Sequence, residues 1–245
     1  MHRCDPGIAQ LISDDRKYTY TKPTFQEVAS ILRASTALSF EKFKPWARQY
    51  LENMWSPNLD SVTTTCIPLA TETIILARRC SIPSVLKRAL YELVRMKGFG
   101  QIHVIHDDND DSKSAGTLSA TDHLILTKAR EKLGSRWIEI ALSPPRVLRP
   151  AASVPTPRPL CDNAHCTFAS PENTHRIYRK LVHDSGIFAS YIWDTICGVQ
   201  ALLDAPWTDE GCCVGCVGKI KGEWQRQKER IWRDLDVWFG LSGTV

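Results

Sequence analysis

The sequence predicts a mainly α-helical fold, built as a helical bundle followed by a cysteine-bearing C-terminal helical subdomain. Apolar residues recur at intervals of three and four along most of the chain, which is the spacing of one helix face. Two pairs of residues, Thr24 with Glu27 and Ser119 with Asp122, have the spacing of a capping box at a helix start. Sustained alternation of apolar and polar residues is missing, so we expect no sheet larger than a short hairpin.

The first two predicted helices lie near the N-terminus. Thr24 and Glu27 start a helix that extends to about residue 37. The apolar face of this helix holds Phe25, Val28, Ile31 and Leu32. The second helix begins near Phe43, because Pro45 would clash with the carbonyl four residues before it in a helix that began much earlier. Its apolar stripe consists of Phe40, Phe43, Ala47, Tyr50, Leu51 and Met54.

Two short helices and one long helix are predicted next. The apolar stretch from Ile74 to Ala77 indicates a third helix, and a fourth begins near Ser84. Ser119 and Asp122 start a longer helix that reaches about Leu142. The buried face of this long helix is expected to carry Leu126, Ala129, Leu133, Trp137 and Ile140.

Two segments interrupt the helical pattern. Residues 107–116 are polar and acidic, so we expect a mobile surface loop there. Residues 143–159 contain six prolines and cannot continue a helix. We therefore predict four parts: an N-terminal tail (1–23), a helical bundle (24–142), a proline-rich linker (143–159) and a cysteine-bearing helical subdomain (160–245).

The C-terminal part carries helical patterns on both sides of Asp184 and Gly186. These residues separate two segments with helical spacing of apolar residues. The apolar residues are Ile177 and Leu181 in the first segment and Phe188, Tyr191, Ile192 and Leu202 in the second. The last helix carries Val217, Ile220, Trp224, Ile231, Leu235 and Trp238. Gly215, Gly218 and Gly222 each weaken its first turns by up to about 1 kcal/mol relative to alanine. Tertiary contacts or a bound metal must hold that end of the helix.

Two pairs of closely spaced cysteines could form a zinc site: the two-residue spacer between Cys213 and Cys216 is favourable, and the four-residue spacer between Cys161 and Cys166 is permissible but less specific. Cys161 and Cys166 form one pair, Cys213 and Cys216 form the other, and four thiolates brought together give a tetrahedral site for a structural zinc ion. We therefore expect the two pairs to converge in space. Three neighbouring residues could each replace one ligand: His165, His175 and Cys212. In an alternative interpretation the cysteines bind no metal and are small buried apolar residues.

Residues Phe25 to Trp55 and Ile67 to Val94 carry hydrophobic patterns that resemble the helical region following the BTB fold in fungal BTB/POZ domain proteins. The late cysteine pair, the tryptophan-bearing last helix and the closing Trp238 to Leu241 are also similar to that group's ending. The resemblance implies an adaptor that binds other proteins, since the BTB fold is generally an interaction module. Only some 23 residues precede the first helix, so no BTB domain is expected upstream and the chain should be a monomer or associate weakly.

Composition excludes several classes of protein. The 31 basic and 27 acidic residues give a formal charge of +4, too small to demand a nucleic-acid partner. No apolar run approaches the roughly 20 residues of a membrane helix, and the N-terminus lacks the apolar stretch of a signal peptide. Nine cysteines without an export signal are better explained as reduced thiols or metal ligands. We therefore expect an intracellular protein, in the cytoplasm or nucleus.

The sequence contains no pattern typical of a catalytic centre. It has no nucleophile elbow, zinc-protease motif or phosphate-binding glycine loop. The predicted function is thus that of a non-enzymatic protein-interaction or scaffold protein. One alternative is a zinc-dependent nucleic-acid-binding regulator that uses the basic last helix, with Trp224 and Trp232 stacking on bases. Another is a cysteine-dependent enzyme with a thiol activated by a histidine.

Overall fold

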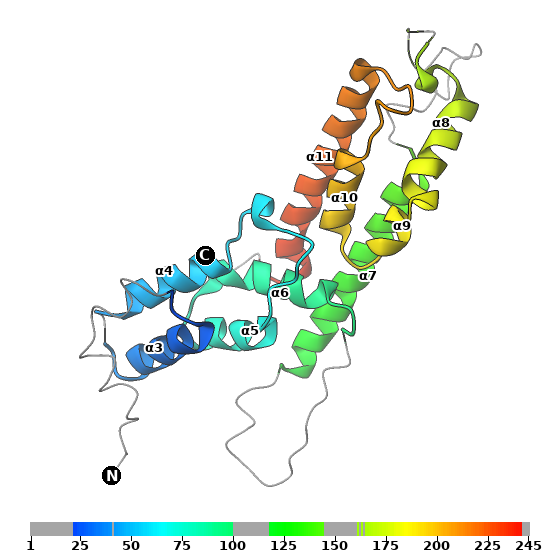
Figure 1. Cartoon of the computed structure of the whole chain (residues 1–245). Coiled ribbons are helices and arrows are strands. Elements are labelled where there is room, and N and C mark those ends of the chain that lie inside the picture. The colour runs from blue at the N-terminus through cyan, green and yellow to red at the C-terminus, as the bar shows by residue number, and fades with distance from the viewer. Residues whose placement is uncertain are drawn as a thin grey trace.

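The structure is a computed structural model that describes residues 22–40, 42–99, 118–144, 161, 163 and 165–241. These residues contain nine α-helices and no strand, which confirms a mainly α-helical fold (Figure 1). The helices are α3 (Phe25–Ala37), α4 (Lys44–Met54), α5 (Ala70–Arg79), α6 (Leu86–Arg95), α7 (Ala120–Leu142), α8 (Pro171–Tyr178), α9 (Ile187–Ser190), α10 (Thr195–Asp204) and α11 (Val214–Trp238). Residues 1–21, the predicted acidic loop 107–116 and residues 145–159 of the predicted linker lie outside the described residues.

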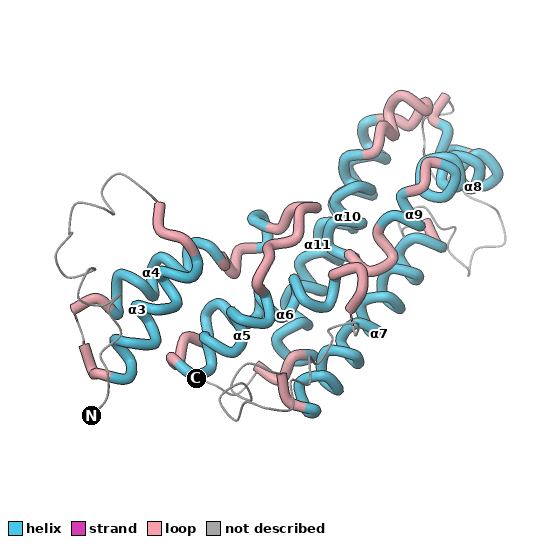
Figure 2. Tube along the Cα trace, turned by 60° about the horizontal axis from the view of Figure 1, so that its bottom comes forward, coloured by secondary structure: helices cyan, strands magenta, loops and turns pink. Residues whose placement is uncertain are grey.

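Helices α3 and α4 form a pair at one end of the molecule (Figures 1 and 2). Thr24 caps α3 as predicted: its backbone N–H donates to Oε2 of Glu27 at 2.8 Å, and the backbone N–H of Glu27 donates to the Thr24 hydroxyl. Helix α4 begins at Lys44, one residue after the predicted start. The prediction was wrong for Phe40, whose side chain is 52% exposed because it lies in the turn before α4 rather than on its buried face.

Helix α6 lies at the centre of the fold, where it contacts α5, α7 and α11. It follows a 3₁₀ turn at Pro83–Val85, so the α-helix itself begins two residues later than predicted. Its position between other elements buries charged side chains as well as apolar ones. These charges therefore need partners within the protein.

The guanidinium of Arg95 supplies many of those contacts. It donates to both carboxylate oxygens of Glu92 at 2.8 and 2.9 Å and to Oδ2 of Asp194 at 2.7 Å. It also donates to the backbone carbonyls of Thr63 and Thr65, at 2.6 and 3.1 Å. The side chains of Arg95 and Glu92 are both fully buried. This network joins α6 to the segment before α5 and to the start of α10.

Helix α7 packs against α10 and α11, and the three lie side by side (Figure 1). All five apolar residues predicted for its inner face are buried. Trp137 fits against α10 at Gly198, where an added Cβ would lie 2.7 Å from Cζ3 of the indole. The indole N–H of Trp137 donates to the carbonyl of Phe188 at 2.9 Å. Residues on both sides of the proline-rich segment thus share one hydrophobic core.

The region between α7 and α11 is divided more finely than predicted. Two segments were expected, whereas the chain forms α8, a π-helix at Arg179–Asp184, α9 and α10. Gly186 separates the π-helix from α9 with a φ of +84°, a conformation that glycine adopts without strain. Asp194 starts α10, because its side chain accepts a hydrogen bond from the backbone N–H of Cys197.

Candidate metal centre

Two pairs of cysteines meet at the end of the molecule where α8 and α11 begin (Figure 1). The sulfur atoms of Cys161, Cys166, Cys213 and Cys216 all lie within 4.8 Å of one another. Cys166 and Cys216 are buried, whereas Cys161 and Cys213 are half-buried. The convergence predicted from the spacing is confirmed, and four thiols at these distances could hold a metal ion.

The start of α11 places the second pair. Cys213 is the residue before the first helical position, and Cys216 lies in the first turn, so both thiols are presented at one helix end. Val214, next to Cys213, is 80% exposed, which shows that this helix start lies at the protein surface. The two half-buried cysteines are the members of the cluster that solvent reaches.

A tight turn places the first pair. The backbone N–H of Cys166 donates to the carbonyl of Asn163 at 2.9 Å, and that of His165 donates to the Asn163 side chain at 3.0 Å. The turn therefore depends on Asn163, whose contribution was not identified from the sequence. The sequence signal for this turn was an asparagine placed two residues before His165 and three before Cys166, since asparagine side chains often accept a hydrogen bond from the backbone two residues later.

Hydrogen bonds join this turn to the chain before α11 without any metal. The hydroxyl of Thr167 donates to the carbonyl of Glu210 at 2.7 Å, and its backbone N–H donates to the carbonyl of Gly211 at 3.1 Å. Gly211 has a φ of +81°, and an added Cβ would lie 2.6 Å from the Thr167 hydroxyl. A side chain at position 211 would therefore disturb the contact that aligns the two cysteine pairs.

Backbone N–H groups point at the sulfur atoms. The N–H of Asn163 donates to Sγ of Cys161 at 3.4 Å, and that of Cys213 donates to Sγ of Cys166 at 3.2 Å. Such donors favour the thiolate over the thiol, and thiolates are the form that binds metals. Two of the four sulfurs thus accept a backbone hydrogen bond before any ion binds.

The thiols of the cluster differ in pKa. The backbone N–H of Cys216 and then the thiol of Cys161 lower the pKa of Cys213 to about 7. Burial raises the pKa of Cys166 and that of Cys216. Binding of a metal to all four sulfurs must therefore displace protons from the buried pair, which makes metal affinity increase with pH.

An aromatic cluster around Trp207 packs between the helices near the cysteine cluster. The ring of Trp207 lies 6.2 Å from that of Phe168, 6.1 Å from that of Tyr178 and 5.1 Å from that of Trp224, measured between centroids. The indole N–H of Trp207 donates to the carbonyl of Leu202 at 2.8 Å. This packing connects α8 and α11 to the segment that follows α10.

The residues proposed as substitute ligands lie outside the four-sulfur cluster. His165 and His175 are exposed, and Cys212 is buried beside the site. Burial raises the pKa of Cys212 to about 12, which makes its thiol a poor nucleophile.

The aromatic residues of α11 are buried. Trp224 is 1% exposed and Trp232 is 7% exposed, and the indole of Trp232 donates to the carbonyl of Pro57. Lys228 is also buried, where its ammonium donates to Oε1 of Gln200 at 2.8 Å. Neither indole is accessible for stacking on a base, so this part of the nucleic-acid alternative lacks structural support.

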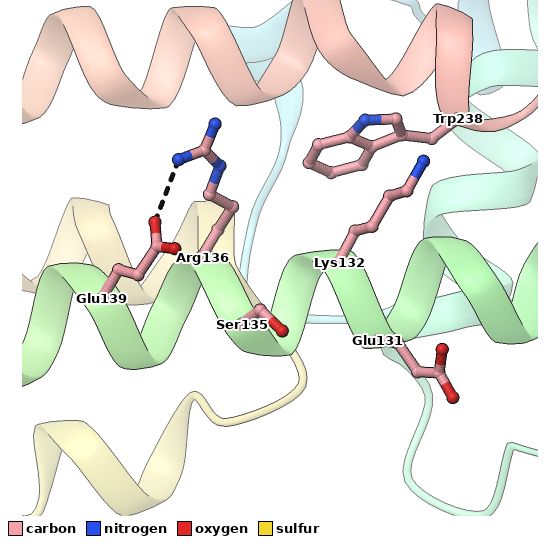
Figure 3. A pocket seen from close by; sticks show the side chains of 6 residues that line it. All are labelled: Glu131, Lys132, Ser135, Arg136, Glu139 and Trp238. Atoms are coloured by element: carbon pink, nitrogen blue, oxygen red, sulfur yellow. Dashed lines mark hydrogen bonds and ion pairs between the residues drawn. The ribbon is translucent and has the colours of Figure 1, made fainter.

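A surface groove between α7 and α11 has no counterpart in the sequence analysis (Figure 3). Arg136 pairs with Glu139 at 2.9 Å, and the ammonium of Lys132 lies 5.7 Å from the centroid of the Trp238 ring. Side chains of both charges line the groove. The groove therefore favours neither an anionic nor a cationic ligand.

Comparisons of the chain with protein-family models, with curated proteins and with solved structures gave no match. Among the helices described, none combines the length and the apolar character needed to cross a lipid bilayer. The chemistry of the cysteine cluster and the exposed surface are therefore the basis for assigning a function.

Proposed function

We propose that this chain is a non-enzymatic protein-interaction or scaffold protein whose C-terminal helical part is stabilised by one structural zinc ion. The observation that carries the proposal is the cluster of four sulfur atoms within 4.8 Å of one another, contributed by Cys161, Cys166, Cys213 and Cys216. Four thiolates in tetrahedral arrangement are typical of zinc, whereas magnesium and calcium prefer oxygen ligands.

The ligand set favours a structural over a catalytic ion. Catalytic zinc sites keep one coordination position for water or substrate, whereas four protein thiolates occupy every position of a tetrahedral ion. Two of the four sulfurs are buried, which further limits access of a substrate to the ion. A zinc ion held in this way would contribute to folding rather than to chemistry on another molecule.

The role of the ion follows from what it connects. It would join the turn at Cys161–Cys166 to the start of α11, where Gly215 and Gly218 weaken the helix by up to about 1 kcal/mol each. The Thr167 hydrogen bonds and the aromatic cluster around Trp207 already hold these segments together. Loss of zinc should therefore loosen this end of the protein without unfolding the helices distant from it.

An exposed apolar surface supports the interaction role. Leu38 is 57% exposed, Phe40 52% and Trp46 36%. Leu38 and Phe40 lie between α3 and α4, and Trp46 lies in the first turn of α4. Exposed apolar residues that cluster on a protein surface are typical of sites that bind other proteins. We propose this turn, at the end of the molecule opposite the cysteine cluster, as a contact surface (Figure 1).

The zinc proposal is tested by metal analysis of reduced protein purified without chelator. We expect one zinc per chain in the wild type, and none in the double variant Cys213→Ser with Cys216→Ser. Cys212→Ala is the matched control, because Cys212 is buried beside the site but lies outside the cluster. Zinc well below one per chain in the wild type, or loss of zinc from the control, would overturn the four-thiolate assignment.

The interaction proposal is tested by affinity capture from a cell extract with quantitative mass spectrometry. Leu38→Asp combined with Phe40→Asp should lose the proteins that the wild type enriches. Val237→Asp, at an apolar residue that is 68% exposed on α11, should retain them. Equal capture by all three proteins would show that the α3–α4 turn is not the contact surface.

A further inference from the structure

Two of the four clustered thiols, those of Cys161 and Cys213, are in direct contact with each other. Their sulfur atoms lie 3.5 Å apart. A disulfide requires about 2.0 Å between sulfurs, so the pair needs to close by only ~1.5 Å. Both residues are half-buried, whereas Cys166 and Cys216 are buried, so a dissolved oxidant reaches this pair first.

We propose that Cys161 and Cys213 are a site of reversible oxidation, at which a peroxide converts the two thiolates into a disulfide and displaces the metal ion. The release of the ion rests on the zinc site proposed above, whereas formation of the disulfide depends only on the contact between the two sulfurs.

The chemistry needs hydrogen peroxide as the oxidant. One thiolate attacks a peroxide oxygen, the O–O bond breaks, and a sulfenic acid and a hydroxide ion form. The second thiolate then attacks the sulfenic sulfur, the S–S bond forms, and a second hydroxide leaves. Each sulfur loses one electron and the peroxide gains two. The hydroxides take protons from solvent and become water.

The consequence for the metal follows from the number of ligands. A zinc ion at this site would lose two of its four thiolates, and the remaining pair, Cys166 and Cys216, is too few to retain it as a structural ion. The new disulfide would join the same two segments that the zinc had joined, across 52 positions of the chain. Oxidation would therefore exchange one link for another and preserve the fold.

Two buried cysteines of the chain are less suited to this chemistry. Cys197 is buried and accepts a hydrogen bond from the guanidinium of Arg95 at 3.4 Å, within the network of α6. Cys212 is buried and precedes Cys213 directly in the chain. Both should remain thiols under conditions that oxidise the half-buried pair, which makes them internal references.

The experiment treats the full-length reduced protein with hydrogen peroxide, follows zinc release with a chromogenic chelator and maps disulfides by peptide mass spectrometry. We expect a Cys161–Cys213 disulfide, one zinc released per disulfide, an unchanged circular dichroism spectrum, and recovery of zinc binding after reduction. Cys212→Ala should give the same result. A different disulfide, or zinc loss without a disulfide, would overturn the proposal.

The two proposals fail separately. If the reduced protein contains no zinc, the structural metal site is wrong, and peptide mapping of the peroxide-treated protein still tests the cysteine pair. If the reduced protein contains one zinc but peroxide produces no Cys161–Cys213 disulfide, the oxidation site is wrong and the metal site stands.

Discussion

Replacing Arg95 by methionine should destabilise the protein more than replacing an arginine at its surface. Methionine keeps an unbranched apolar side chain but removes the guanidinium. Glu92, which is fully buried, then keeps Arg88 as its partner. Asp194 keeps the hydrogen bond from the Tyr91 hydroxyl at 2.7 Å. Both carboxylates lose one cation in a region from which water is largely excluded.

The expected loss can be worked out from the contacts. Removing one partner of a buried ion pair costs about 3–5 kcal/mol, because the remaining charge stays buried. The carbonyls of Thr63 and Thr65 also lose a donor, but both residues are exposed and water can replace it. We therefore expect about 3–5 kcal/mol, which corresponds to a decrease in Tm of roughly 6–20 °C for a chain of this size.

The assay is urea-induced unfolding followed by far-UV circular dichroism. Arg78→Met is the matched control, because Arg78 makes a two-pronged contact with Asp122 at 2.6 Å but is 44% exposed. Because the Arg78 guanidinium is half-exposed, this pair is less desolvated than the Arg95 network and should contribute less to stability. A loss for Arg95→Met no larger than that for Arg78→Met would refute the reasoning, since the two variants remove the same charge and differ in burial.

Two further predictions concern packing and pH. Gly198→Ala should destabilise the protein by about 1–3 kcal/mol, because the added Cβ would lie 2.7 Å from the Trp137 side chain. In Gly218→Ala the added Cβ meets no atom within 4 Å, so this variant should stabilise α11 by up to about 1 kcal/mol. Equal shifts of the two variants in thermal unfolding would contradict this. The hydrogen bonds from Arg78 lower the pKa of Asp122 from 3.8 to about 2, so the stability from its ionised form is complete above about pH 4 and lost towards pH 2. Unfolding free energy should therefore decrease more over that range in the wild type than in Asp122→Asn, and parallel pH curves would argue against it.

Features that depend on neighbouring residues were predictable from the sequence. The starts of α3 and α7 were confirmed because capping requires only Thr24 with Glu27 and Ser119 with Asp122. The buried face of α7 was confirmed because helical periodicity fixes which residues share a side.

The meeting of the two cysteine pairs was predictable from the chemistry of zinc ligands, although no local pattern brings them together.

Features that depend on distant partners were not predictable. Periodicity identified the apolar face of α6 but not the burial of its charged side chains, because Arg95 meets Asp194 only 99 positions further along the chain. The division of residues 171–204 into four helical pieces was missed because their apolar spacing continues across the breaks. The breaks are set by the φ of Gly186 and by the cap at Asp194.

The packing of α7 decides where the chain can be cut. A fragment ending at Leu142 would keep α7 but remove the helices that cover Leu133, Trp137 and Ile140. It would also lose the hydroxyl of Tyr178, which donates to the carbonyl of Ile140 at 2.6 Å. Such a fragment would present a long apolar helix face to solvent and would be prone to aggregate. A soluble truncation that contains α7 therefore has to keep the helices on both sides of the proline-rich segment.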